Sequence, residues 1–464
     1  MQIVRYLFSF MIIYGWMKGW MIMSTLKKEI GLFGGIAILA GIMIGSGIFV
    51  FASLVMVEVG YALGLSLLAW IIGGVITLFS GLTYAELGTM FPETGGYYVY
   101  LRQAYGKKVA FLSGLMNFVL ISSGSIALLS LVFAEILSYM FPLSNLIIKL
   151  IAASLIVILS LVNYFGVKVG STIQNIFLVV KILPIIAIIF IGLFMGTESV
   201  SLSFIPEGSP SFLGVLPMIG FGVVATLWAY EGWTNLNTVA GEMKDVKRDL
   251  PKALTFSIFG VMLLYVLFIF ALYRIIPIGT LSSLGSDANL PIIAMMTTFG
   301  DLGMTLIFVA VMISIFGALN GSVMVFPRVY YAMAEDGTFF SKFNTLDKKY
   351  LTPSVAILGS ALMSILLLVF NIRDLLTFVV FGGLMFNTLI FISVFLFRKR
   401  LPEKDRPYRV PFYPFIPVIA IVGMVGLMIS TLISSLIPSL IGIGVLISGY
   451  FVYDIVFKRK NEHL

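Results

Sequence analysis

Cysteine is absent from the 464-residue chain, and histidine occurs once, as His463 near the C-terminus. Disulfides, thiol catalysis and thiolate metal sites are therefore excluded, as are histidine-based metal sites and catalytic triads. Charge is also scarce, because Asp, Glu, Lys and Arg make up 11% of the residues, against about 25% in soluble domains. We expect no resident metal or cofactor, and an enzyme is disfavoured.

Apolar residues are abundant instead, at 60% of the chain. This composition predicts an all-α polytopic membrane protein. A window of about 19 residues finds twelve apolar segments, at about 31–58, 61–85, 109–139, 145–165, 172–196, 212–240, 254–275, 303–333, 352–371, 374–397, 414–433 and 437–457. Two amphipathic or re-entrant helices are expected between segments, at Gly95–Tyr105 and Asn289–Thr298.

The distribution of Lys and Arg predicts the orientation of these segments. With the N-terminus inside and residues 1–22 left out, 23 of these residues fall in inner loops and 3 in outer loops. The positive-inside rule then places both termini in the cytoplasm, and we expect a multi-pass protein of the plasma membrane of a prokaryote. The net charge of +8 is explained in this way without a nucleic-acid partner.

The first residues are apolar but carry Arg5 and Lys18. They could form a signal peptide or an additional membrane helix, but we favour translation from Met23 and treat residues 1–23 as an extension from a misplaced start. The expected domains are a transport core at 24–400, two appended helices within 401–457, and a tail at 458–464.

A glycine-rich stretch, Gly41–Phe49, interrupts the first segment. Gly45, Ser46 and Gly47 predict a break in the helix at mid-membrane. Backbone groups left unpaired in hydrocarbon cost several kcal/mol, so such a break is stable only where it lines a cavity or meets a ligand. Glycines in membrane helices otherwise mark close helix packing, which is the alternative here.

The sixth segment is interrupted again, at Trp228–Trp233 after Gly220 and Gly222. Corresponding breaks five segments apart indicate a five-plus-five inverted repeat with its binding site at the midplane. The repeat would comprise segments 1–5 (about 31–196) and 6–10 (about 212–397). The halves show no convincing residue-level similarity, so the repeat rests on the breaks and the topology.

A broken helix exposes backbone groups of both signs. The N–H groups near Ser46, Gly47 and Ile48 suit a carboxylate. Carbonyls suit an ammonium group, and the candidates are Ile42, Met43 and Ile44 in the first break and Trp228, Ala229 and Glu231 in the second. A carboxylate and an ammonium group held a few ångströms apart describe an α-amino acid.

Polar side chains inside the segments are further candidates for coupling and gating. Lys181 lies near the bilayer centre, where a buried ammonium group is costly and therefore indicates a functional role. It could be a fixed charge in place of sodium, a proton acceptor or a structural tether. Glu231 could face the ligand, titrate, or face a wet vestibule. Trp228 is a candidate gate. Tyr265 could bond Lys181 or the broken backbone, and Asn320 could line the site or pair helices. The carboxylates near segment ends, Glu58, Glu86 and Glu135, are expected to be solvated.

Several motifs resemble one known family. They are Gly45-Ser-Gly-Ile-Phe49, Pro92-Glu-Thr-Gly-Gly-Tyr-Tyr-Val-Tyr100, Trp228-Ala-Tyr-Glu-Gly-Trp233, Glu242-Met with Arg248-Asp-Leu-Pro251, Asn320-Gly-Ser322, and Asp405-Arg-Pro-Tyr-Arg-Val-Pro411. Together they resemble the L-type amino acid transporters, within the amino acid–polyamine–organocation superfamily. The similarity runs in order from about Leu26 to Phe457.

The resemblance implies twelve helices with the five-plus-five repeat, discontinuous helices 1 and 6, and alternating access. It implies that Met43, Ser46 and Gly47 bind the amino acid's backbone groups together with Trp228, Ala229 and position 231. It also implies that Lys181 stands in for a sodium site and that Tyr265 lies near the substrate. Two departures are Trp228, where animal relatives usually have Phe, and Glu231, where they usually have a small residue. Animal relatives pair with a single-span glycoprotein through a disulfide, which is impossible here without cysteine. Prokaryotic members of this type work alone, and the resemblance implies the same for this chain.

We therefore predict a sodium-independent amino acid transporter, either an exchanger or proton-coupled. The alternatives are an amine or polyamine transporter, with Glu231 as an additional counter-charge, and a transporter-like amino acid receptor. Ser46 and Gly47 speak against amines, and the absence of a long polar output domain speaks against a receptor.

Overall fold

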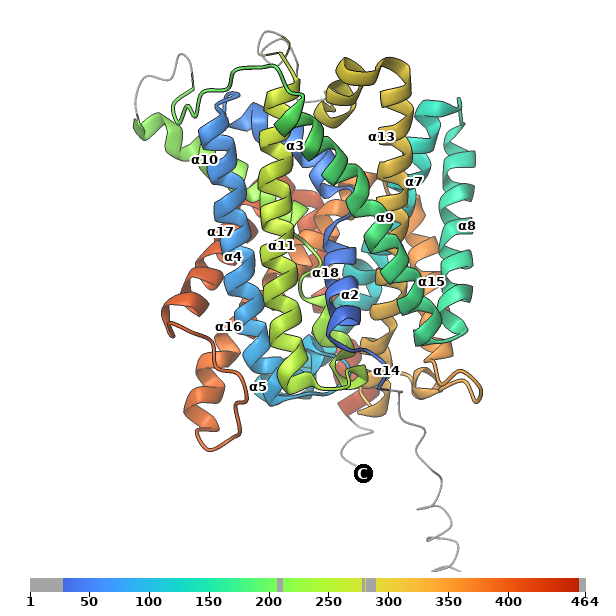
Figure 1. Cartoon of the computed structure of the whole chain (residues 1–464). Helices are drawn as coiled ribbons and strands as arrows, with labels where there is room; N and C mark the ends of the chain where they lie inside the picture. The colour runs from blue at the N-terminus through green and yellow to red at the C-terminus, as the bar shows by residue number, and fades with distance from the viewer. Residues whose placement is uncertain (1–27, 207–211, 278–279, 281–288, 459–464) are drawn as a thin grey trace, which may run out of the picture.

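The computed structural model describes residues 28–206, 212–277, 280 and 289–458. Within these ranges the chain is helical and forms no strand beyond a single bridge between Ile30 and Met243. The helices stand side by side in one bundle (Figure 1). In chain order they are α2 (Leu32–Met43), α3 (Gly47–Glu58), α4 (Leu63–Met90), α5 (Tyr97–Tyr105), α6 (Lys107–Met116), η1 (Asn117–Ile121), α7 (Ser122–Met140), α8 (Asn145–Tyr164), α9 (Val167–Phe194), α10 (Phe212–Ala229), η2 (Asn235–Glu242), α11 (Val246–Ile275), α13 (Leu290–Val325), α14 (Pro327–Glu335), η3 (Ser341–Asn344), α15 (Ser354–Leu366), η4 (Leu367–Val369), α16 (Ile372–Arg400), α17 (Phe415–Ser434), α18 (Leu436–Val452) and η5 (Tyr453–Lys458).

The membrane-protein prediction is confirmed. Among the described residues, 9 helices are long and apolar enough to cross a bilayer, and α2 with α3 adds one more as a bent pair. Two shorter apolar helices, Gly214–Ala229 and Ser354–Val369, coincide with the sixth and ninth predicted segments. Twelve spans and the inverted repeat stay predictions, and the predicted N-terminal extension lies outside the described residues.

Both predicted amphipathic stretches are helical. The first is α5, and the second is the opening of α13, before a kink at Gly300, whose φ is 59°. A positive φ is a conformation that glycine adopts without strain. The kink lets α13 change direction before it enters the bundle.

Helices α4 and α11 pack closely because α4 carries small residues on the shared face. A Cβ on Gly74 would collide with Met262, and one on Gly81 would collide with Ile258. In lipid, where helices gain little from hydrophobic burial, this close backbone approach drives association.

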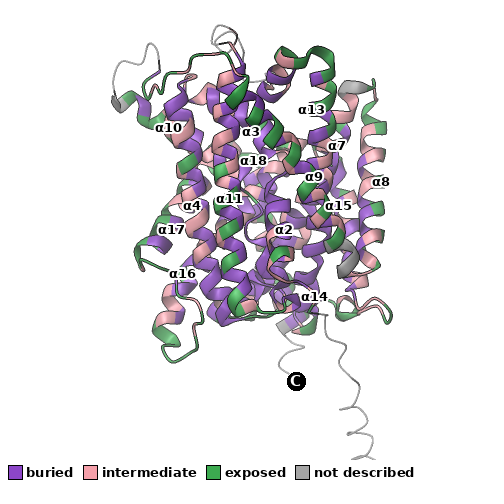
Figure 2. Cartoon of the chain, viewed as in Figure 1, coloured by how far each residue is buried: buried purple, intermediate pink, exposed green. Residues whose placement is uncertain are grey.

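The outer faces of the bundle are apolar, as expected where lipid replaces water. Figure 2 shows buried residues along the centre of the bundle and exposed residues on its outer faces. On α17 and α18, Val422, Ile433 and Ile437 are exposed by 66%, 78% and 72%. These side chains would face the hydrocarbon of the bilayer.

The prediction of a solvated Glu86 is wrong. Its carboxylate is buried and accepts two hydrogen bonds from Arg398, at 3.0 and 2.7 Å, and one from the Val410 N–H at 2.8 Å. Arg398 in the last turn of α16 and Val410 in the loop that follows α16 supply these donors to the end of α4. A buried carboxylate is stable only with such partners, and they lie more than three hundred residues away in the sequence.

Candidate functional site

The first predicted break is present between α2 and α3, which meet at a bend of 48°. Ile44 ends α2 with a ψ of 79°, outside the helical range. Beyond it, the backbone N–H groups of Ser46, Gly47 and Ile48 donate no hydrogen bond within the described residues. The N-terminus of α3 therefore presents free donors and the positive end of a helix dipole.

The second predicted break follows Ala229, where α10 ends. A Cβ on Gly47 would lie 2.8 Å from the Ala229 Cα, and one on Gly232 would lie 2.8 Å from Ile42 Cγ2. Each break thus touches the other through a glycine. Gly232 also has a φ of 110°, which disfavours any side chain.

Tyr265, on α11, joins the two breaks. Its hydroxyl lies 3.1 Å from the Met43 carbonyl oxygen and 3.3 Å from that of Ala229. A tyrosine hydroxyl has one proton to donate, so it satisfies one of these carbonyls at a time. The other carbonyl stays available to an ammonium group.

Lys181, on α9, lies behind the first break and is fully buried. Its Nζ donates to the carbonyl oxygens of Gly41 at 2.5 Å, Ile44 at 2.9 Å and Ser314 at 3.3 Å. The Ser314 hydroxyl also donates to Ile44, at 3.0 Å. The ammonium therefore uses all three donors on backbone carbonyls, and no carboxylate pairs with it in the described part of the chain.

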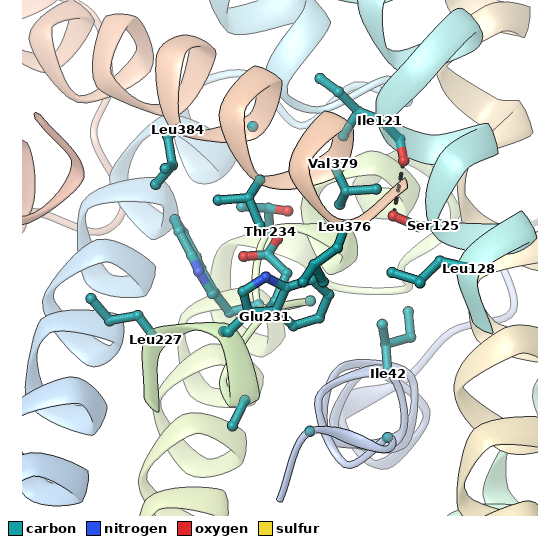
Figure 3. Close-up of a pocket in the computed structure, with 18 of the residues that line it drawn as sticks. Ile42, Ile121, Ser125, Leu128, Leu227, Glu231, Thr234, Leu376, Val379 and Leu384 are labelled. Carbon is teal, nitrogen blue, oxygen red and sulfur yellow. Dashed lines mark hydrogen bonds between the residues drawn. The ribbon is translucent and has the colours of Figure 1, made fainter. Parts of the chain in front are cut away.

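A cavity of about 400 Å³ opens at the two breaks. Its walls come from both breaks and from α7 and α16, as Figure 3 shows. Of the predicted substrate-binding residues, those that line it are Met43, Ser46, Gly47, Trp228, Ala229 and Glu231.

The other predicted residues lie outside the cavity lining. The Ile44 carbonyl faces Lys181 and Ser314 instead, and Ile48 is fully buried. Tyr265 and Lys181 form hydrogen bonds with backbone carbonyls of the breaks, on the side away from the cavity. Asn320 lies among α8, α9 and α13, where its amide bonds two other amides.

Glu231 and Trp228 occupy the cavity itself. Figure 3 shows the Glu231 side chain directed into the open space near Thr234. No cation forms an ion pair with it within the described residues. Trp228 stacks on Phe51, with ring centroids 5.6 Å apart and planes at 14°, so its indole joins α10 to α3 beside the break.

Sequence reasoning missed the walls that α7 and α16 supply. Ser125 and Leu128 on α7 and Val379 on α16 lie on the same side of the cavity and line it together (Figure 3). A sequence signal was present on α7, where Ser122 and Ser125 interrupt an apolar segment. In the structure, a π-helical turn, η1, precedes them. Such turns are frequent at functional sites.

The cavity is open at one end and closed at the other. It extends to Ile372, Thr431 and Ser435, which lie at the far ends of α16 and α17 from the face where α2 begins. At the opposite end, Arg328 donates to Glu242 at 2.9 Å, and their side chains are 1% and 0% exposed. This ion pair joins η2 to α14 beneath the second break.

Replacing Glu242 by alanine should lower stability strongly, because an unpaired Arg328 would stay buried. Breaking a buried pair costs about 3–5 kcal/mol, whereas replacing both partners by apolar residues is often neutral. We expect a lower melting temperature in detergent for Glu242→Ala, with recovery in the double variant Glu242→Met, Arg328→Met. Asp405→Ala is the control, because its pair with Lys247 is exposed and should contribute less than about 1 kcal/mol. Equal melting temperatures for Glu242→Ala and Asp405→Ala would contradict this.

Comparison with known proteins places the chain among membrane transporters. The family model described as amino acid permease matches residues 30–451. The serine/threonine exchanger SteT of Bacillus subtilis (strain 168) is 35% identical over 440 residues, covering 94% of this chain and 98% of the relative.

Two animal proteins are also similar. The human b(0,+)-type amino acid transporter 1 is 30% identical over 401 residues, covering 84% of this chain and 80% of its own length. The mouse large neutral amino acids transporter small subunit 2 is 31% identical over 444 residues, covering 92% and 81%. The residues matched by the family model include both helix breaks and the walls of the cavity.

Proposed function

The chain belongs to the amino acid permease family, and from this we propose that it exchanges amino acids across the plasma membrane by alternating access, without sodium. The observation that carries the proposal is the contact of the two helix breaks, Gly47 against Ala229, at the floor of one cavity. The first break supplies N–H groups that donate to nothing within the described residues, and both breaks supply carbonyls that share the one proton of the Tyr265 hydroxyl.

These groups match the two charged ends of an amino acid. The carboxylate would accept from the N–H groups of Ser46, Gly47 and Ile48, at the positive end of α3. The ammonium group would donate to the Met43 or Ala229 carbonyl, whichever Tyr265 leaves free. Because both ends are held by backbone, the side chain would point toward α7 and α16, and these walls would select it.

Lys181 explains how such a site works without sodium. Its ammonium already neutralises the carbonyls at the end of α2, which is the environment that a sodium ion would otherwise occupy. A fixed charge there holds the broken helix in place whether or not sodium is present. A proton-coupled cycle, in which Lys181 or Glu231 discharges, is the alternative that the experiment below distinguishes.

The side of the membrane follows from the loops. The basic residues at the start of α6 and in the loops after η2, α14 and α16 lie at the closed end of the cavity, so we infer that this end is cytoplasmic. The open end then faces outside. Without cysteine, the chain cannot form a disulfide with a partner.

Small hydroxylated amino acids are the first substrates to test, since one relative is a serine/threonine exchanger.

The test is uptake by the full chain reconstituted in sodium-free liposomes. Labelled serine should enter vesicles loaded with unlabelled serine and should not enter empty vesicles. Uptake into empty vesicles that rises with an inward proton gradient would replace exchange by proton coupling. No uptake of any amino acid under either condition would overturn the proposal.

Glu231 supports a second candidate, in which amines or cationic amino acids are carried. A carboxylate that faces the cavity and forms no ion pair within the described residues would attract a cationic side chain by a charged hydrogen bond worth about 1.5–3 kcal/mol. If lysine competes with serine uptake, Glu231→Gln should weaken that competition by roughly tenfold or more and leave serine competition unchanged. Glu135→Gln, at an exposed position outside the cavity lining, is the control. Putrescine uptake in the absence of any amino acid uptake would favour the amine transporter.

A further inference from the structure

Three buried amide side chains form a row behind α2. Asn163 on α8 donates from Nδ2 to Asn320 Oδ1 at 3.0 Å, and Asn320 on α13 donates from Nδ2 to Gln174 Oε1 at 3.1 Å. All three are at most 2% exposed. Figure 1 shows α8, α9, α13 and α2 in the same part of the bundle. The row therefore connects three helices to the half-helix that ends at the first break.

The direction of every amide in this row is fixed from one end. Asn163 Nδ2 also donates to the Leu159 carbonyl, at 2.9 Å, so its nitrogen must be the atom on that side. Asn163 Nδ2 also donates to Asn320, so the Asn320 atom that accepts must be Oδ1. The other amide atom of Asn320, Nδ2, is then the one that faces Gln174. By this sequence of donors and acceptors, Gln174 accepts with Oε1 and is left with Nε2 as a donor at the far end.

That donor has no partner among the residues that the structure describes. Gln174 Nε2 is buried and makes no hydrogen bond to any of them, and its residue is 0% exposed. It lies against Gly41 of α2, where a Cβ would collide with the carboxamide, and a Cβ on Gly321 would lie 3.0 Å from Nε2. The two glycines make the space into which the amide fits.

An unpaired buried donor raises the free energy of the state in which it is observed, because it has lost water and gained nothing. The adjacent element is the end of α2, where the helix stops and its last carbonyls accept from side chains instead of from the helix itself. In the present state the Gly41 carbonyl is bound by Lys181. Gln174 and Lys181 are seven residues apart, on one face of α9, so both side chains contact α2.

We propose that Gln174 is a positioning residue for α2: its Nε2 is unpaired while the cavity is open outward, and takes a backbone carbonyl of α2 in the opposite state of the transport cycle. The amide row behind it keeps the donor aimed at α2 throughout. Gln174 thereby disfavours the outward-open state and favours the inward-open one. The inference rests on the alternating access proposed above, but not on the identity of the substrate.

The test uses the absence of cysteine, since one introduced thiol is the only thiol in the protein. Ser125→Cys places it in the cavity, on α7. A small membrane-impermeant thiol reagent, added outside to right-side-out vesicles without substrate, labels it at a rate that follows the outward-open population. Gln174→Met has no donor and keeps the length of the side chain, so labelling should become roughly threefold faster or more. The KM for external substrate should fall in parallel.

Asn175→Met is the matched control, because it removes an amide with a buried, unpaired oxygen from the adjacent position on α9. It should leave the labelling rate unchanged. Gln174→Asn withdraws the carboxamide from Gly41 by one methylene group and should act in the same direction as Gln174→Met, which provides a second variant if the first does not fold.

Unchanged or slower labelling in the Gln174 variants would overturn the inference, and so would an equal increase in Asn175→Met, which would indicate general loosening. If labelling responds as expected but no amino acid is transported, Gln174 keeps its role and the proposed substrate is wrong. If amino acids are exchanged but labelling does not respond, the proposed function stands and the role of Gln174 does not.

Discussion

Replacing Lys181 by methionine is expected to lower the rate of amino acid exchange by about 100-fold or more. The variant leaves the carbonyls of Gly41, Ile44 and Ser314 without their shared donor. An unsatisfied buried acceptor costs about 1–3 kcal/mol, and each 1.4 kcal/mol corresponds to a factor of ten. The end of α2 would shift to find other donors, and the Met43 carbonyl that we assign to the ammonium group would shift with it.

Lys149→Met is the matched control for this prediction. Lys149 is on the neighbouring helix α8, is partly exposed and forms no ion pair among the described residues. The same substitution there should leave exchange within twofold or so of the wild type, since surface changes are usually small. Both variants should be compared as monodisperse protein in liposomes, with and without sodium. Exchange by Lys181→Met at the wild-type rate would show that the ammonium does not organise the break.

Replacing Gly47 by alanine is the second change with a large expected effect. The new Cβ would lie 2.8 Å from the Ala229 Cα and 3.3 Å from its carbonyl oxygen. Both are backbone atoms, which cannot turn aside as a flexible side chain can, so the two breaks must separate. Overpacking of this kind costs about 1–3 kcal/mol, and we expect exchange to fall by roughly 5- to 150-fold.

Gly220→Ala tests whether the effect belongs to this contact. Gly220 is in α10, the helix that ends at Ala229, but a Cβ there meets nothing within 4 Å. Alanine also has the higher helix propensity, so this variant should exchange at least as well as the wild type. A loss of exchange in Gly220→Ala as large as in Gly47→Ala would show that the result reflects glycine substitution in general.

Much of the fold could be predicted from local patterns. Apolar length marked the spans, and the clusters around Ser46 and Glu231 marked the two breaks, because a helix in hydrocarbon cannot stop without a compensating partner. Lys181 was visible as a charge in an apolar segment. Each of these signals is contained in a short stretch of sequence.

The remaining features depend on contacts between distant residues. No residue near Glu86 in the sequence indicates that Arg398 and the Val410 N–H bind its carboxylate. The position of Glu86 near the end of a segment therefore predicted a solvated carboxylate. The Ile44 carbonyl was expected at the substrate site, but its direction is fixed by Lys181 and Ser314. The amide row behind α2 likewise needs three helices to be placed before its unpaired end can be found.

The contact of the breaks also explains why an α-amino acid is a better match than an amine. An amine would use the carbonyls near Tyr265 but would leave the N–H groups at the start of α3 unpaired. Unpaired donors in a closed site cost affinity. A substrate with both charged ends satisfies donors and acceptors together, which is the core of the account.

The most direct measurement of that claim is competition for labelled serine exchange by compounds that lack one charged end. Serine and threonine should compete, whereas serine methyl ester and ethanolamine, which lack the carboxylate, and N-acetylserine, which lacks the ammonium group, should compete roughly 10- to 150-fold more weakly, as expected for the loss of charged hydrogen bonds. If ethanolamine or the methyl ester competes as well as serine, the N-terminus of α3 does not bind a carboxylate, and the two-ended site is wrong.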